Sequence, residues 1–413
     1  MPRLLLVILA SAIAVGPVPL LAQAPPDPIQ QAIGGVKALL EKRPNDPTLY
    51  FYLASFQTQA GERDNALANL AKARELGDGL LPNVDFGFDK LKDDPAFQSV
   101  RAAFEQALPK VADAPVAFRL DDKTFGPEGI AYDSVSKQFF IGSVPHKRVV
   151  RVSASGKVAP FSAAGDGLHQ ILGVAVDAKR RIVYAVSTNA LTSGKPLHNA
   201  VFGFDLASGK RLFEYAVPLA QQLNDVAVAP NGDLYASDSR SGAIWRIRTS
   251  AAAGTPAPEV TPFLAAGTVG GSNGLVVAPD GNTLYVAHST GVVRVDTATG
   301  KLDKLMPPPR QTIAAIDGLY LWKGDLIGIQ NVTNPGRVIR LRLNPAGTEI
   351  MGIDTLQSHH NAAFDSPTTG AIAGNALYVL GTTQLPRYND KGEVEGAGAL
   401  KKPAVVRVPL EKK

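Results

Sequence analysis

Four oxygen-bearing side chains recur along the chain, and together they could hold a metal ion. Glu128, Asn224, Asn273 and Asp317 each stand near the start of a short apolar segment. If the fold brings the two carboxylates together, their mutual repulsion and their removal from water must be compensated. A divalent cation compensates both effects, and a set of oxygen ligands suits Ca²⁺ or Mg²⁺ better than softer metals. The pattern therefore predicts a site for one divalent ion, with Ca²⁺ as the first choice and Mg²⁺, Mn²⁺ or Zn²⁺ as alternatives.

The predicted ligand set is incomplete, which favours a catalytic role. Calcium commonly takes about six to eight oxygen ligands, so four protein ligands leave positions for water and for a substrate oxygen. The alternative is that Asn273-Gly274 and Asp317-Gly318 form hairpin turns, because these dipeptides favour such turns. In the fourth unit, however, Pro279-Asp280-Gly281 already supplies a separate turn after the apolar segment.

A sixfold repeat defines the elements that must position these residues. Each unit has a polar or small residue, a short apolar strand, a turn and a second strand with an aromatic residue. The first positions, aligned, are Glu128, Leu172, Asn224, Asn273, Asp317 and Thr369, with spacings of 44, 52, 49, 44 and 52 residues. Four short strands per unit of this length are typical of a propeller blade. A β-sandwich is the alternative, but it does not predict a sixfold repeat.

The chain is therefore predicted to be mainly β, with a six-bladed β-propeller over residues 115–413. The innermost strands of the blades line a central tunnel, so the six aligned positions should form one ring. The segment from Pro115 to Leu120 is predicted to add a strand to the last blade, which closes the ring and removes an open sheet edge.

Further polar residues are predicted to stand near the mouth of the tunnel. Strands alternate in direction, so the ends of the second strands should lie at the same face as the ring. The residues at these ends are Ser143, Asp238, His288, Asn331 and Thr382. Asp238 and His288 are the titratable members and therefore candidate catalytic residues. His288 could shuttle protons at neutral pH; the alternative is a solvent-exposed loop histidine.

His359 and His360 precede the sixth unit and could reach over the opening. Adjacent side chains in an extended segment point in opposite directions, so at most one of them is expected to do so.

Residues 27–110 have a helical pattern and precede the propeller. Asp27-Pro28, Asp46-Pro47 and Asp94-Pro95 each predict a helix start, because Asp caps a helix and Pro fits its first turn. The segment between them resembles one tetratricopeptide repeat, through Tyr50, Leu53, Ala54, Gly61, Ala66, Leu70 and Ala73. The region is predicted to be a small helical cap or a surface for a protein partner; an ordinary helical spacer is the alternative.

The four predicted ligands also carry a family resemblance. Glu128 lies in GPEGIAYD, Asn224 in LNDVAVAP, Asn273 in SNGLVVAPDG and Asp317 in IDGLYL. In this order and spacing, they resemble the metal-site pattern of the regucalcin/gluconolactonase family, also called senescence marker protein-like. The resemblance covers roughly residues 118–413. It implies a six-bladed propeller, Ca²⁺ or another divalent ion, hydrolysis of lactones or related esters, and Asp317 as general base.

Two main functions follow as hypotheses. The first is a divalent-metal-dependent hydrolase of small lactones or esters, in which Asp317 or a neighbouring acid activates water. The second is a non-catalytic exported propeller that binds a ligand or protein, with a structural metal. A strictosidine synthase-like condensation is a third alternative. The sequence has no H-E-x-x-H or G-x-x-x-x-G-K-[ST] motif, so zincin and P-loop chemistries have no support.

Composition and the N-terminus restrict the setting in which the protein acts. The 413 residues contain no cysteine, which excludes disulfides and thiolate metal sites. The net charge of +5 is spread along the chain without interleaved aromatics, so we expect no nucleic-acid partner. Residues 1–24 resemble a signal peptide, with Arg3, an apolar run and Ala22-Gln23-Ala24. We expect a periplasmic or secreted protein with no membrane association after cleavage; a retained membrane anchor is the alternative.

Overall fold

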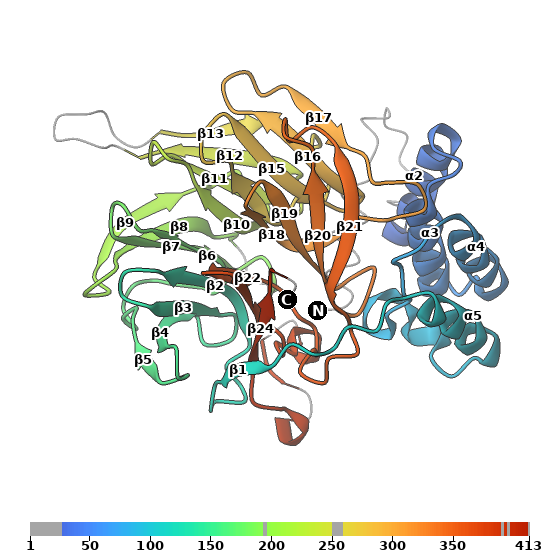
Figure 1. Ribbon diagram of the computed structural model, residues 1–413, viewed down its shortest axis with the longest axis horizontal. Helices are drawn as coiled ribbons and strands as arrows, with labels where there is room; N and C mark the ends of the chain where they lie inside the picture. Colours follow the sequence, from blue (N-terminus) through green and yellow to red (C-terminus); the bar gives the residue numbers. More distant parts are fainter. Residues whose placement is uncertain (1–26, 193–195, 250–258, 390–391, 395–396, 412–413) are drawn as a thin grey trace.

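Six four-stranded antiparallel sheets are arranged around a common axis in the computed structural model (Figure 1). The structure describes residues 27–192, 196–249, 259–389, 392–394 and 397–411. The predicted signal peptide, residues 1–24, lies outside these ranges. The sheets confirm the prediction of a six-bladed β-propeller that is mainly β, preceded by a few helices.

The blades are numbered here in chain order, and within each blade the first strand is the innermost. Blade 1 consists of β2 (Pro127–Asp133), β3 (Gln138–Ser143), β4 (Arg148–Ser153) and β5 (Val158–Pro160). Blade 2 consists of β6 (Gln170–Asp177), β7 (Ile182–Thr188), β8 (Asn199–Asp205) and β9 (Arg211–Ala216). Blade 3 consists of β10 (Leu223–Val228), β11 (Leu234–Asp238), β12 (Ala243–Arg248) and β13 (Glu259–Leu264). Blade 4 consists of β14 (Leu275–Val277), β15 (Thr283–His288), β16 (Gly291–Asp296) and β17 (Leu302–Leu305). Blade 5 consists of β18 (Ile316–Trp322), β19 (Asp325–Gln330), β20 (Arg337–Leu343) and β21 (Ile350–Gln357).

Blade 6 combines strands from the two ends of the propeller. It consists of β22 (Gly370–Ala373), β23 (Ala376–Leu380), β24 (Ala404–Pro409) and, as its outermost strand, β1 (Val116–Arg119). β1 pairs antiparallel with β24, and Arg119 lies opposite Ala404. This pairing confirms the predicted closure of the ring by the segment that precedes the first unit.

The second strand of each blade is buried on both of its faces. Every residue of β7 and of β19 is buried, because each blade is covered on both sides by its neighbours. The apolar side chains of adjacent blades share clusters; in one of them, Phe140 of blade 1 packs with Val183 and Phe202 of blade 2. This double burial explains why these strands have continuous apolar sequences without a strict polar alternation.

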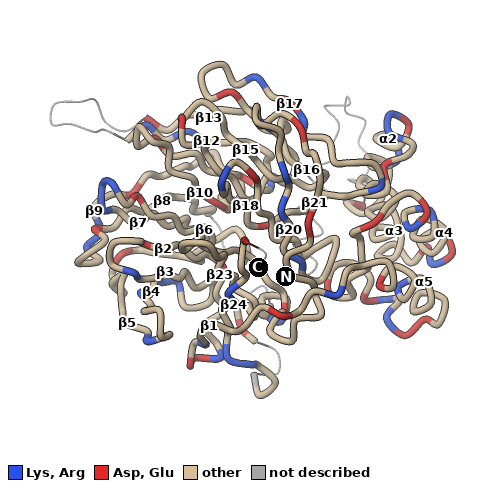
Figure 2. The backbone as a smooth tube through the Cα atoms, viewed as in Figure 1, with Lys and Arg blue, Asp and Glu red and all other residues tan. Residues whose placement is uncertain are grey.

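Charged residues gather on the outer strands, the connecting loops and the helices (Figure 2). Some of them join neighbouring blades. Arg181 of blade 2 donates two hydrogen bonds of 2.8 and 2.9 Å to the buried carboxylate of Asp133 in blade 1. Burial alone would raise the pKa of Asp133, but the hydrogen bonds from Arg181 and Ser136 outweigh it and lower the pKa.

The helical region precedes the propeller and packs against its side near blades 4 and 5 (Figure 1). Its elements are α2 (Pro28–Lys42), α3 (Pro47–Ala60), α4 (Arg63–Leu76), the short turns η1 (Val84–Phe88) and η2 (Asp89–Leu91), and α5 (Pro95–Gln106). Two further short turns, η3 (Leu385–Arg387) and η4 (Ala397–Ala399), lie near the C-terminus.

The predicted helix starts are correct. Asp27, Asp46 and Asp94 are the N-caps of α2, α3 and α5, and each carboxylate accepts a backbone N–H of the first turn. α3 ends at Gly61, whose φ of 82° is the left-handed conformation that glycine adopts readily. The resemblance of α3 and α4 to a tetratricopeptide repeat stays a prediction. None of the helices in the described ranges is long and apolar enough to cross a membrane.

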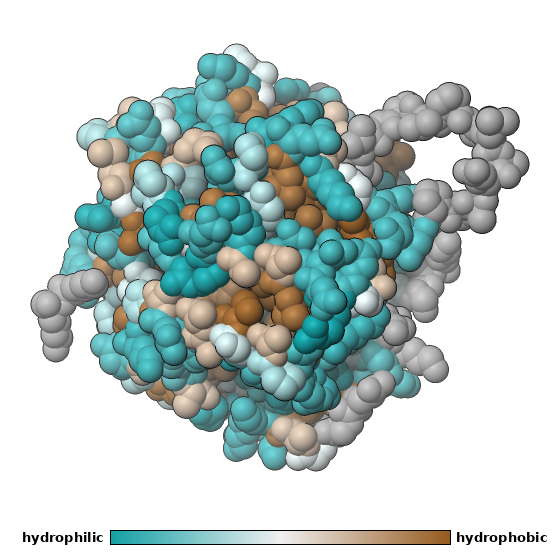
Figure 3. All heavy atoms as spheres, turned by 90° about the vertical axis from the view of Figure 1, so that its right-hand side faces the viewer, coloured by the Kyte–Doolittle hydropathy of each residue, from teal (hydrophilic) through white to brown (hydrophobic). Residues whose placement is uncertain are grey.

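Buried hydrogen bonds attach the helical region to the propeller. The Tyr52 hydroxyl of α3 donates to the backbone oxygen of Ser289 in blade 4, at 2.6 Å. The Thr48 and Thr312 hydroxyls lie 3.0 Å apart, and Leu81 N donates to Thr333 O at 2.8 Å. From the helical side the molecule presents a mixed surface, with apolar residues visible between hydrophilic ones (Figure 3).

Candidate functional site

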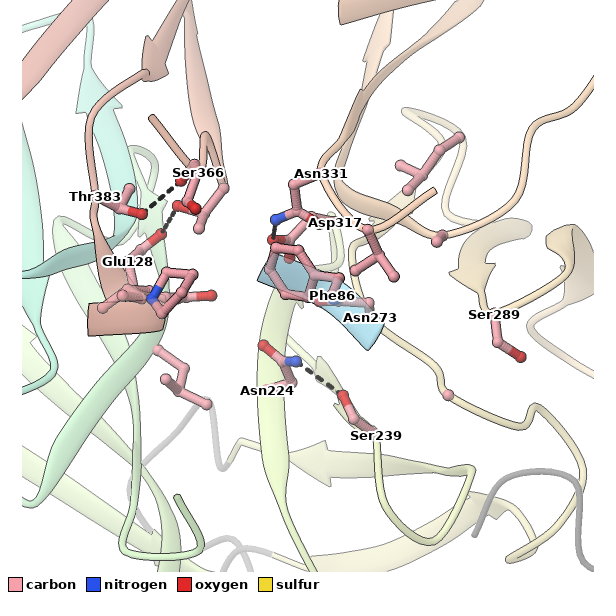
Figure 4. A pocket seen from close by; sticks show the side chains of 18 of the residues that line it. Phe86, Glu128, Asn224, Ser239, Asn273, Ser289, Asp317, Asn331, Ser366 and Thr383 are labelled. Carbon is pink, nitrogen blue, oxygen red and sulfur yellow. Dashed lines mark hydrogen bonds between the residues drawn. The ribbon is translucent and has the colours of Figure 1, made fainter. Parts of the chain in front are cut away.

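The four predicted metal ligands line one cavity at the mouth of the central tunnel. Glu128, Asn224, Asn273 and Asp317 come from blades 1, 3, 4 and 5, and they share a cavity of about 130 Å³ (Figure 4). Leu172 of blade 2 also lines it. From blade 6, Thr368 lines the cavity and its hydroxyl donates to the backbone oxygen of Glu128 at 3.0 Å. Five of the six aligned positions thus line this cavity; the sixth, Thr369, lies outside its lining, although its hydroxyl also donates to the Glu128 backbone oxygen.

Breaks in strand pairing direct these side chains toward the axis. The register of β2, β6, β10 and β18 against the second strand shifts at one place in each, and Glu128, Leu172, Asn224 and Asp317 lie inside these shifts. A β-bulge bends the strand and re-aims a side chain that would otherwise point to a sheet face. The same local irregularity, repeated in four blades, therefore builds the ring.

Hydrogen bonds settle how the amide of Asn224 is oriented. The Ser239 hydroxyl donates its single hydrogen to the backbone oxygen of Ser272, at 2.6 Å. Ser239 Oγ must therefore accept at its contact of 2.8 Å with Asn224, which identifies the donor as Asn224 Nδ2. The Asn224 oxygen then lies on the side away from Ser239, as Figure 4 shows, and is available as a ligand.

The two carboxylate ligands differ in their partners. Asp317 Oδ2 accepts a hydrogen bond from Asn331 Nδ2 at 2.5 Å, and Asn273 also donates to Asp317. Glu128 Oε2 is buried and has no hydrogen-bond partner among the described residues. A buried charged oxygen without a partner is costly, so this atom marks a position where a cation or a proton is required.

A third carboxylate, the partly buried Asp225, adds to the negative charge around the axis. Burial raises the pKa of Glu128 well above its usual value, and repulsion from Asp317 and Asp225 raises it further. Burial raises the pKa of Asp225 to about 7 and that of Asp317 to about 6, although hydrogen bonds from Asn331 and Asn273 act to lower the latter. No Lys, Arg or His is among the described residues that line the cavity. The chemistry of this donor set fits a divalent cation.

The walls of the cavity are apolar and come partly from the helical region. Phe86 of η1 and Tyr52 of α3 line the cavity together with residues of the propeller. The other apolar lining residues are Leu172, Leu191, Ile316, Val332, Leu385 and Pro386. A polar floor under apolar walls is the usual composition of a small-molecule site. The helical region is therefore part of the site's wall.

Of the residues predicted near the mouth, only Asn331 lines this cavity. Asp238 lies behind the wall. Its carboxylate accepts the backbone N–H groups of Gln221, Gln222 and Ser241 at 2.8 to 3.1 Å, so it holds the loops of blade 3 together.

His288 does not line the cavity either. It lies in a separate hollow between blade 4 and the start of α3, together with Arg43 and Lys304. Burial lowers the pKa of His288 to about 4, with a further contribution from these two cations. A largely buried, neutral imidazole at this position cannot contact a molecule in the axial cavity.

The expectation for His359 and His360 is wrong. The two rings lie side by side, with centroids 4.0 Å apart, because the segment forms a turn instead of an extended strand. Neither ring lines the axial cavity; both face Glu105 of α5.

The sequence analysis missed Asp225, Ser239 and Phe86. Asp225 directly follows a predicted ligand, and the alternation of a regular strand would point it away from the ring. It lines a second cavity and not the axial one, yet its carboxylate is close enough to Glu128 to raise that residue's pKa. Phe86 belongs to a different region of the chain, and its segment carries no sequence signal for contact with the tunnel mouth.

Comparison with known proteins gives similarity in fold only. No family model matches the chain, and no curated protein matches its sequence. A gluconolactonase from Xanthomonas campestris shares 16% identity with a TM-score of 0.46, over 73% of this chain and 97% of the other. A PQQ-bound aldose sugar dehydrogenase from Streptomyces coelicolor shares 15% (TM-score 0.45; 73% and 96% covered). Virginiamycin B lyase from Staphylococcus aureus shares 14% (TM-score 0.47; 71% and 98% covered). At these values, none of these activities transfers to this chain.

Proposed function

We propose that the protein is a divalent-metal-dependent hydrolase of small lactones or related esters, that calcium is its metal, and that it acts in the periplasm or outside the cell. The observation that supports the metal-dependent chemistry is the convergence of four oxygen donors from four blades in one cavity. There the buried Glu128 Oε2 has no hydrogen-bond partner in the part of the chain that the structure describes.

The ligands of the ion would be Glu128, Asn224, Asn273 and Asp317. When bound, a divalent ion supplies a Lewis acid that polarises a carbonyl oxygen and stabilises the charge that develops on it. The chain's own contribution is to orient the ligands: Ser239 turns the oxygen of Asn224 to the axis, and Asn331 holds Asp317 Oδ2.

Asp317 is the candidate general base. In the metal-free protein burial raises its pKa to about 6, and a bound cation would act in the opposite direction, so the carboxylate is ionised at neutral pH and can accept a proton. It lies in the cavity wall, where a water molecule beside a bound ester could transfer a proton to it. Its partner Asn331 restricts the orientation of the carboxylate during that transfer.

The size and lining of the cavity favour a small substrate. About 130 Å³ is below the volume of a typical drug-sized pocket, and the apolar walls favour a ring or short acyl chain over a charged group. Phe86 and Tyr52 form part of the cavity wall. A neutral lactone or a short ester satisfies these requirements.

A panel of lactones and aryl esters, assayed with calcium and with a chelator, tests the proposal. We expect turnover that requires the metal, is abolished in Asp317→Asn and is retained in Asp121→Asn, whose side chain is 95% exposed. Hydrolysis that survives chelation would overturn the metal-dependent mechanism. Tight calcium binding without turnover across the panel would instead identify a non-catalytic, ligand-binding propeller.

A further inference from the structure

Three potential metal ligands meet where the helical region joins the propeller, outside the axial cavity. They are Glu105 at the end of α5, and His359 and His360 in the turn between blades 5 and 6. Glu105 Oε1 lies 3.2 Å from His359 Nε2 and 3.6 Å from His360 Nε2. One ligand atom from each of the three residues lies within 4.8 Å of the other two.

These distances match the spacing of ligands around a zinc ion. Two ligand atoms about 2.0–2.1 Å from Zn²⁺, at the tetrahedral angle, are ~3.3 Å apart. The observed distances of 3.2 and 3.6 Å bracket this value. The three side chains are 12 to 35% exposed, so an ion can reach them from solvent.

The hydrogen bonds of Ser358 show that His360 Nε2, which faces the Glu105 carboxylate, carries no proton when the ring is neutral. Ser358 Oγ donates to Val111 O at 2.9 Å, and its contact of 3.0 Å with His360 Nδ1 then requires Nδ1–H to be the donor. In the neutral tautomer, His360 Nε2 therefore carries a lone pair that points toward Glu105 Oε1. Two facing lone pairs repel, and a cation between them turns this repulsion into attraction.

The surrounding contacts hold the ligands in place. Glu105 Oε2 accepts from Arg101 at 3.2 Å, one turn earlier on α5, which directs Oε1 to the histidines. The segment after α5 is fixed to the histidine turn, because Ser358 N donates to Val111 O at 2.7 Å. His360 donates a hydrogen bond to Ser358 Oγ, and Ser358 Oγ donates one to the backbone oxygen of Val111. Hydrogen bonds of this kind, made by the nitrogen that does not bind the metal, orient metal-binding histidines.

We propose that Glu105, His359 and His360 bind a borderline transition-metal ion, Zn²⁺ in the first instance, which joins the helical region to the propeller. Two imidazole nitrogens and one carboxylate select such an ion over Ca²⁺, whereas the oxygen ligands of the axial cavity favour Ca²⁺. The two sites therefore differ in the metal that their ligands prefer. The proposal for this second site does not depend on the proposed hydrolase activity.

Zinc titration of the tag-free protein at saturating calcium tests this proposal. We expect about one equivalent of Zn²⁺ to bind in calorimetry, and Co²⁺ in its place to give the visible absorption of a tetrahedral site. Binding should be lost in the double variant His359→Gln/His360→Gln. It should persist in His169→Gln/His198→Gln, because these rings also lie 4.6 Å apart but belong to no group of three metal-binding side chains among the described residues.

Zinc should also raise the unfolding temperature of the wild type and leave that of the double variant unchanged. If the double variant does not fold, Glu105→Gln provides the same comparison, because it keeps the shape of the side chain. The proposal is overturned if the wild type shows no saturable zinc uptake, or if uptake is the same in the ligand variants. The calcium-dependent esterase assay is read separately, so neither result decides the other.

Discussion

The backbone N–H of Gly274 donates a hydrogen bond of 2.8 Å to the backbone oxygen of Asp317. This bond joins the inner strands of blades 4 and 5 next to two of the predicted ligands, Asn273 and Asp317. A Cβ atom on Gly274 would overlap the Asp317 oxygen and lie 2.5 Å from Leu319 N. Glycine follows the ligand here because the neighbouring backbone leaves no room for a side chain.

Gly274→Ala should therefore destabilise the protein by about 1–3 kcal/mol, the usual cost of overpacking, and weaken calcium binding because Asn273 and Asp317 move apart. Denaturant unfolding and calcium calorimetry measure the two effects. Gly34→Ala in α2 is the matched control: its Cβ would meet nothing within 4 Å, and alanine favours a helix over glycine, so no loss of stability is expected. Equal effects in both variants would contradict the close approach of the two strands.

The metal-free protein should lose stability as the pH rises from about 6.5 to 8.5. Burial raises the pKa of Asp225 to about 7 and that of Glu128 well above its usual value. The folded state then binds more protons than the unfolded state, so the free energy of unfolding falls with pH, by up to about 1.4 kcal/mol per pH unit for each group. Thermal unfolding in chelator at several pH values measures this slope.

Two controls isolate the carboxylates as the cause of this slope. Saturating calcium should flatten it, because bound carboxylates stay ionised, and Glu128→Gln should reduce it in chelator. Burial lowers the pKa of His288 to about 4, so this histidine makes the free energy of unfolding rise with pH. That contribution ends at about pH 6.5, the pKa of an unfolded histidine, and does not extend into the range measured here. A metal-free protein whose stability rises between pH 6.5 and 8.5 would be inconsistent with the buried acids.

Phe86→Leu should widen the cavity and change substrate selectivity, if the proposed hydrolysis holds. Phe86 is the aromatic residue that η1 places in the cavity wall, so a smaller side chain gives room for a longer acyl group. We expect kcat/KM for a longer ester, relative to a short one, to increase by about 10-fold. Phe213→Leu, on an outer strand and 38% exposed, should leave the ratio unchanged. An unchanged ratio in Phe86→Leu would place the substrate elsewhere.

Phe118→Ala should open the ring closure. Phe118 of β1 is buried, and its ring lies 5.4 Å from that of Phe139 in blade 1, so it joins the outermost strand of blade 6 to the next blade. Loss of a buried phenylalanine side chain costs about 3–5 kcal/mol. Val116→Ala is the control in the same strand. Val116 is 36% exposed, so its truncation should lower the free energy of unfolding far less. If Phe118→Ala and Val116→Ala lowered the free energy of unfolding by similar amounts, Phe118 would contribute no specific packing to the ring closure.

The repeat itself could be predicted from the sequence, because each blade buries its second strand on both faces and each turn needs its own residues. The spacing of Glu128, Asn224, Asn273 and Asp317 follows from that repeat, and a propeller brings equivalent positions to one axis. The helix starts at Asp27, Asp46 and Asp94 could also be predicted, because a capping carboxylate acts within its own first turn. All of these depend on local chemistry or on a regular period.

Contacts between segments without a common period were decided only by the tertiary structure. Asp225 raises the pKa of Glu128 although it lines a different cavity, and residue types alone do not show this proximity. The loops of blade 3 withdraw Asp238 from the cavity, and the helical region covers His288 and brings Phe86 to the tunnel mouth. A turn places His359 beside His360, and both face Glu105, about 250 residues earlier in the chain. Such contacts depend on how separate surfaces pack, and packing is a property of the whole fold.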